Sequence, residues 1–214
     1  MTEAEWLACD EPTALLATAV ERGTPVRKVR LFYAGCCRAV WDRIRDSRIR
    51  KLIELGERVA DGEVKADLHY KPYWKVVRAI RAADQQAKWD GADRQGLGLV
   101  EALILAGGPF PTVGCLPVLA AVPESGGAAG QAQLARDVFG PPSRSSSGDP
   151  QCLTASAVAV ARAVYSARDF SAMPILADVL QEAGCEDEQL LRHCRGIGPH
   201  VRGCWVLDWV LGRE

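Results

Sequence analysis

The chain has 214 residues, of which 48% are hydrophobic and 25% are charged, and its formal net charge is −1. This length is enough for one ordinary domain or two small ones, and the composition is that of a globular protein, which excludes a disordered or fibrous chain. The near-neutral charge argues against a dedicated nucleic-acid binder, which usually has a basic surface.

The first residues, MTEAEWLACDEP, are acidic and lack the basic start and apolar run of a secretory signal. The longest apolar run, Leu116 to Val122, contains a proline and is too short to span a membrane. Eight cysteines are scattered without the spacing of a disulfide framework. We therefore expect a cytoplasmic protein with reduced thiols and no membrane contact.

Helix signals follow one another along the first sixty or so residues. Thr2–Glu5 has the form of a capping box, and Asp10 and Pro12 start a second helix that ends at Gly23. Thr24 and a following proline begin a long helix, whose apolar residues repeat at threes and fours as far as Ile44. Asp46 or Ser47 is expected to start a further helix, which Asp61-Gly62 ends.

A basic face is predicted on these helices, because the stretch from Arg27 to Lys51 holds nine basic and two acidic residues. It could bind RNA, DNA or an acidic partner, together with an aromatic–basic stretch around residue 73 that could stack on bases. The interpretation we favour is a solvated helix surface balanced by acids elsewhere, with core aromatics. The candidate binding residues are Arg27, Arg30, Arg38, Arg43, Arg45, Arg48, Tyr73 and Trp74.

The middle of the chain is again helical by pattern, at 63–88, 92–106, 116–121 and 128–139. Its Gly-rich loops match neither the phosphate-binding loop nor the dinucleotide fingerprint. GPPSRSSSGDP, from 140 to 150, is the clearest linker. We therefore divide the chain into an amino-terminal helical block at 1–140, a linker at 141–150 and a carboxy-terminal helical block at 151–214, although the two blocks could share one core.

The carboxy-terminal block predicts four helices. Thr154 caps the first, Ser171 caps the second, and a third begins at the acidic run 186–188. His200 or Val201 opens the last, which stops at Gly212. No strand alternation is present, so the predicted fold is all-α, an irregular bundle of about ten or more short helices, with stacked helical hairpins as one arrangement.

Cysteine and histidine gather along the same block, and neutral His and thiolate Cys are zinc ligands. One hypothesis is a zinc site that uses His193 or Cys194, His200 and Cys204, with Cys185 as a fourth ligand. No CxxC pair supports it. We favour the alternative that the cysteines are small buried hydrophobes and the histidines bond the backbone of the Gly-rich turn, so no metal and no cofactor is predicted.

Catalytic motifs are absent from the sequence, which has no GxSxG, HExxH or DxDxDG. A nucleophilic pair could be drawn from Cys194 or Cys204 with His193 or His200, but the sequence shows no lowered pKa and no orienting third group. We therefore predict no catalytic residue and no enzymatic activity.

Two ends of the chain resemble a known group of proteins. MTEAEWLACDEP, RKVRLFYAGCCRAVW and DVFGPP, followed by the motif HCRGxGxHVRGCWVLDxxLG near the carboxyl end, resemble an uncharacterised bacterial family typical of planctomycete-like genomes rich in paralogues. The resemblance covers about residues 1–60 and 136–214. It implies a modular interaction segment, and no activity can be carried over.

The expected function is a non-enzymatic helical interaction or adaptor module, a subunit of a larger complex whose partner is another protein. Six tryptophans favour this, since Trp, Tyr and Arg dominate interface hot spots. The first alternative is a nucleic-acid-binding accessory protein that uses the basic face. The second is a zinc-stapled or Cys/His-dependent enzyme.

Overall fold

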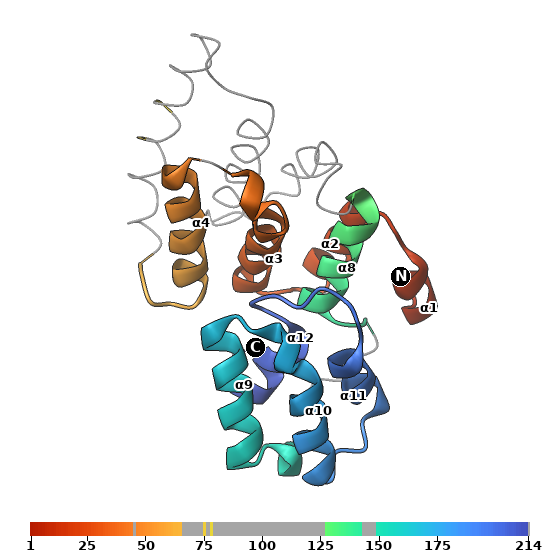
Figure 1. Ribbon diagram of the computed structural model, residues 1–214. Coiled ribbons are helices and arrows are strands. Elements are labelled where there is room, and N and C mark those ends of the chain that lie inside the picture. The colour runs from red at the N-terminus through yellow and green to blue at the C-terminus, as the bar shows by residue number, and fades with distance from the viewer. Residues whose placement is uncertain (45, 66–74, 76–77, 79–126, 143–148, 214) are drawn as a thin grey trace. The chain divides into compact units, whose positions relative to one another are not determined.

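The computed structural model describes residues 1–44, 46–65, 75, 78, 127–142 and 149–213 (Figure 1). Throughout these ranges every regular element is a helix, which confirms the predicted all-α class and irregular bundle. The helices predicted at 92–106 and 116–121, and nearly all of the one at 63–88, lie outside the described residues. No helix within the described ranges is both long enough and apolar enough to cross a membrane.

Contacts group the chain into two compact units. The C-terminal unit consists of Met1–Ala8 together with Arg136–Glu214, and the central unit is Cys9–Ala135. This grouping divides the chain within α8 (Gly127–Phe139), ahead of the linker predicted at 141–150. It also assigns the first eight residues to the unit that contains the carboxyl end, which local sequence signals could not indicate because the pairing is long-range. The three-part division by the linker stays a prediction.

The described helices of the central unit are α2 (Pro12–Glu21), α3 (Val26–Ala39) and α4 (Ser47–Ala60), with the first part of α8. Helices α3 and α4 pack against each other as a hairpin. Arg38 of α3 donates two hydrogen bonds to the buried Glu57 of α4, at 3.0 and 2.8 Å, which fixes the pairing of the two helices.

The predicted long helix to Ile44 is wrong in its last turn. Helix α3 ends at Ala39, and a 3-10 helix, η1 (Trp41–Arg43), follows. The guanidinium of Arg38 stacks 3.8 Å from the Trp41 ring centroid, and Nη2 of Arg50 donates to the Trp41 carbonyl at 3.2 Å. These side-chain contacts hold the turn, and hydrophobic periodicity cannot register them.

The C-terminal unit contains α1 (Glu3–Ala8), the end of α8, α9 (Ala155–Ala167), α10 (Met173–Glu182), α11 (Glu188–Arg195) and α12 (Trp205–Leu211), with two 3-10 turns, η3 (Pro150–Cys152) and η4 (Phe170–Ala172). Helix α10 packs against both α9 and α11, and α12 packs against α9 (Figure 1). The core that they share includes Tyr165, Leu176, Leu180, Leu190 and Trp205. Short helices of this kind are stable only through such packing.

Most helix ends in this unit follow the predicted signals. Thr2 and Glu5 form a reciprocal capping box at the start of α1, with N–H to side-chain distances of 2.7 and 3.3 Å. Thr154 caps α9 through the N–H of Ala157. The acidic run at 186–188 contributes Asp187, which caps α11.

Two predicted starts are wrong. Ser171 lies inside η4, where Asp169 accepts its N–H, and α10 begins only at Met173. The last helix begins at Trp205, not at His200 or Val201. The N–H of Val201 donates to a side-chain carboxylate from α8, so this segment forms a loop around that carboxylate. A partner about sixty residues away decides this local structure.

Candidate metal centre

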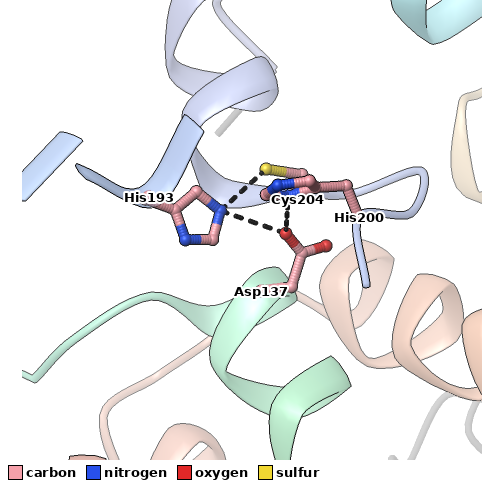
Figure 2. A group of neighbouring side chains, drawn as sticks. All are labelled: Asp137, His193, His200 and Cys204. Atoms are coloured by element: carbon pink, nitrogen blue, oxygen red, sulfur yellow. Dashed lines mark hydrogen bonds and ion pairs between the residues drawn. The ribbon is translucent and has the colours of Figure 1, made fainter. Parts of the chain in front are cut away.

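Four side chains with metal-binding donor atoms converge in the C-terminal unit (Figure 2). They are Asp137 near the end of α8, His193 in α11, His200 in the loop that follows α11, and Cys204 directly before α12. One donor atom from each residue lies within 4.8 Å of the other three. Among the described residues, no other group of His, Cys, Asp and Glu side chains comes together in this way.

Asp137 is the centre of the group. Its Oδ1 lies 3.0 Å from Nε2 of His193 and 2.8 Å from Nδ1 of His200. Its Oδ2 accepts the backbone N–H of Val201 at 3.0 Å. Nε2 of His193 also lies 3.3 Å from Sγ of Cys204. The two imidazole rings meet edge to face, with centroids 4.9 Å apart.

Burial and charge set the protonation of this group. The Asp137 side chain is only 3% exposed. Burial by itself raises the pKa of Asp137, but hydrogen bonds from His193 and His200 and the charge of those rings outweigh it and lower the pKa to about 2. Burial, followed by the Asp137 charge, raises the pKa of Cys204 well above its ordinary value. Without a metal ion, the site therefore holds a carboxylate and a neutral thiol.

The donor set fits a zinc ion. Two imidazoles, a thiolate and a carboxylate are the ligands that Zn²⁺ takes in proteins. Tetrahedral bonds of zinc place neighbouring donors about 3.3–3.6 Å apart. Three contacts here have the shorter hydrogen-bond distances of 2.8, 3.0 and 3.3 Å, and all four donors lie within 4.8 Å of one another, so small side-chain movements would open the group around an ion. One thiolate and one carboxylate also balance a 2+ charge, so the filled site is neutral, as suits a buried position.

The same geometry disfavours a cysteine nucleophile. His193 and Cys204 are within hydrogen-bond reach, with Asp137 as the third member of a set that resembles a catalytic triad. However, Asp137 and Cys204 both face the same nitrogen, Nε2, whereas a triad places its orienting carboxylate on the opposite nitrogen of the base. Cys204 is also fully buried, and its raised pKa opposes thiolate formation.

The structure unites three of the five predicted metal candidates, His193, His200 and Cys204. Cys185 and Cys194 are not part of the group and lie in the apolar core, where burial raises the pKa of Cys194 to about 12. The favoured expectation that the histidines bond turn backbone is wrong, because both bond the Asp137 carboxylate.

Sequence reasoning missed Asp137, the residue at the centre. It lies on the far side of the predicted linker from the other three donors. A usable signal was present in α8, where Leu134, Asp137 and Val138 share the buried face at helical spacing. A carboxylate on the apolar face of a short amphipathic helix needs a buried partner, and this points to a site.

Three arginines of the predicted basic face pair with acids of their own unit. Arg27 pairs with Asp61 at 3.1 Å, Arg38 with Glu57, and Arg48 with Asp46. Arg30 is half-buried in α3. Arg45, Tyr73, Trp74 and the side chain of Arg43 lie outside what the structure describes. The balanced-surface interpretation and the nucleic-acid alternative both stay predictions.

Comparison of the chain with protein-family models, with curated proteins and with solved structures finds no match. The resemblance to a bacterial paralogous family therefore stays a prediction.

Proposed function

We propose that this protein is a non-enzymatic helical interaction module whose C-terminal unit is held together by a structural zinc ion. The observation that carries the proposal is the convergence of Asp137, His193, His200 and Cys204. Four protein donors fill a tetrahedron and leave no position for water or a substrate, which is the mark of a structural rather than a catalytic zinc site.

The positions of the ligands explain what such an ion would do. They come from the end of α8, from α11, from the loop after α11 and from the residue before α12. Helices α11 and α12 have only eight and seven residues, too short to be stable alone. A bound ion would fix both helices to the end of α8, and its binding free energy would add to that of folding.

Exposed apolar side chains support the part of the proposal that concerns a protein partner. Ile175 on α10 and Ile197 in the loop after α11 are exposed large hydrophobic residues of the C-terminal unit. Ile197 lines a shallow pocket with Met173 and Pro174. Exposed apolar side chains of this kind are available for contact with another protein.

The metal content of the purified chain tests the proposal. The protein is prepared without a histidine tag, and zinc is measured by plasma mass spectrometry after dialysis. We expect about one zinc ion per chain, and Asp137→Asn is expected to bind zinc at least about tenfold more weakly, because a neutral amide replaces the anionic ligand.

Asp178→Asn is the matched control, since Asp178 is an exposed carboxylate of the same unit, paired with Arg195 on the surface. Its zinc content should equal that of the wild type. Wild-type protein that holds no zinc as purified and binds none on titration contradicts the proposal, whatever the variants do.

A further inference from the structure

A pocket of about 490 Å³ lies in the C-terminal unit, directly beside the metal-ligand cluster. This volume is in the range of small-molecule sites. Residues of α1 and of α11 both line it. Its lining combines apolar surfaces with charged groups, namely Trp6, Leu7, Pro141 and Trp205 with Glu3, Arg136, Glu188, Gln189, Arg192 and His193.

His193 belongs to both the pocket and the metal-ligand cluster. Its Nε2 faces Asp137 and Cys204, and Figure 2 shows its second ring nitrogen on the side of the ring away from both. That nitrogen, Nδ1, makes no hydrogen bond with any described residue. The His193 side chain is 20% exposed and is therefore more accessible than the side chains of Asp137 (3%) and His200 (6%).

Metal binding would determine what His193 presents to the pocket. When Nε2 gives its lone pair to a metal ion, the ring proton must be on Nδ1, which becomes a hydrogen-bond donor. Histidine ligands of metals almost always donate this second N–H to a carboxylate, a carbonyl or water. No described residue provides that acceptor for His193, so the acceptor is water or a group bound in the pocket.

Arg192 supplies a positive charge beside this donor. Its side chain is 79% exposed, and its guanidinium pairs with the exposed Glu188 at 3.4 Å. An ion pair of this kind is weak, so an incoming anion can replace it at little cost. The indoles of Trp6 and Trp205 and the side chain of Leu7 form apolar walls around these polar groups.

We propose that this pocket binds a carboxylate that is attached to an apolar group, and that the carboxylate accepts the Nδ1 hydrogen of His193 and pairs with Arg192. The inference rests on the proposed zinc site, because metal ligation is what makes Nδ1 the donor. The chemistry is shared by small carboxylic acids with an aliphatic or aromatic group and by a peptide that ends in an apolar residue.

The test uses the full chain loaded with Co²⁺, whose visible absorption reports on a tetrahedral site. N-acetyl-leucine, N-acetyl-leucinamide and a short peptide with a free carboxy-terminal leucine are titrated separately. Binding is followed by the cobalt spectrum and by tryptophan fluorescence. We expect the acid to bind at least about tenfold more tightly than its amide, since a charge-assisted hydrogen bond is lost in the amide.

Arg192→Gln should weaken binding of the acid by about tenfold and leave Co²⁺ binding unchanged. Arg195→Gln is the matched control on the same helix, because Arg195 bonds Asp178 and Gln181 and does not line the pocket. Stronger binding of the peptide than of N-acetyl-leucine identifies a protein terminus as the ligand, and the reverse order identifies a small acid.

Equal binding of acid and amide, or equal effects of the two arginine substitutions, overturns the inference even if the cobalt site forms. Failure of Co²⁺ to bind contradicts the proposed metal centre instead. In that case the fluorescence titration still measures the pocket, and acid binding without a metal ion contradicts the role given to His193.

Discussion

Gly140 lies against the indole ring of Trp205, so closely that a Cβ atom on Gly140 would be 3.0 Å from Cγ of the indole. Gly140 directly follows α8 and has a φ of +67°, a left-handed conformation that favours glycine. The contact therefore joins the end of α8 to the first residue of α12, at the same two elements that contribute Asp137 and Cys204.

Gly140→Ala is expected to lower the free energy of unfolding by about 2–4 kcal/mol, because it adds crowding in a packed core to the cost of a left-handed alanine. Gly184→Ala is the control, since Gly184 also has a positive φ, +88°, but meets no atom within 4 Å. It should cost only about 1–2 kcal/mol. Urea denaturation measures both unfolding free energies, and equal losses in the two variants would contradict a destabilising contact between the added methyl group and Trp205.

Replacing two buried cysteines separates ligation from packing. Cys204→Ser should reduce zinc affinity by at least about 100-fold, because a serine hydroxyl cannot replace a thiolate ligand. Cys194→Ser should leave zinc affinity within about twofold and only lower stability, since it places a hydroxyl in an apolar core. Competition with a chromogenic chelator measures the affinities. A similar loss of affinity in both variants would contradict the assignment of Cys204.

The cap of α9 is a local test of how the sequence sets a helix start. Thr154 accepts the N–H of Ala157 at 3.3 Å, and Thr154→Ala should cost about 1 kcal/mol of unfolding free energy. Ser156→Ala changes an exposed hydroxyl two residues further on and should be neutral or slightly stabilising. Thermal unfolding followed by circular dichroism compares them. A Thr154→Ala variant as stable as the wild type would contradict the capping role.

The Arg38–Glu57 pair predicts a large effect in the central unit. Arg38→Ala leaves the Glu57 carboxylate buried without its bidentate partner and should cost about 3 kcal/mol or more. Arg48→Ala removes a half-exposed partner of Asp46 and should cost less than about 1 kcal/mol. Equal losses in denaturant titrations would show that Arg38 acts only as a surface charge.

Thiol labelling provides a prediction that needs no substitution. Cys36 and Cys37 are fully buried in α3, and burial raises the pKa of each. Iodoacetamide at pH 8 should therefore modify the partly exposed Cys9 in the native protein and leave Cys36 and Cys37 unmodified until denaturant is added. Peptide mass spectrometry locates the label, and early modification of Cys36 would contradict this packing of α3.

Local sequence rules predicted local structure well. The capping box at Thr2, the cap at Thr154 and the stop at Gly212 depend on residues within a few positions, and each lies where its signal indicated. The last helix start was misplaced because Val201 bonds Asp137, a contact across 64 positions that no local pattern contains. The same limit applies to the candidate site. His193, His200 and Cys204 share one stretch of sequence and were predicted together, whereas Asp137 lies 56 positions before His193 and was missed.

The wide separation of Asp137 from His200, 63 positions along the chain, also constrains the order of events during synthesis on the ribosome. The whole of Cys9–Ala135 has been made before Asp137 appears, and Asp137 must then wait for the last of its partners. Until Cys204 emerges, α1 and the end of α8 remain without α12, the last helix of their unit. A nascent chain stalled before His193 would therefore present the Asp137 carboxylate to chaperones and proteases without its two histidine partners, whereas the finished chain buries this carboxylate.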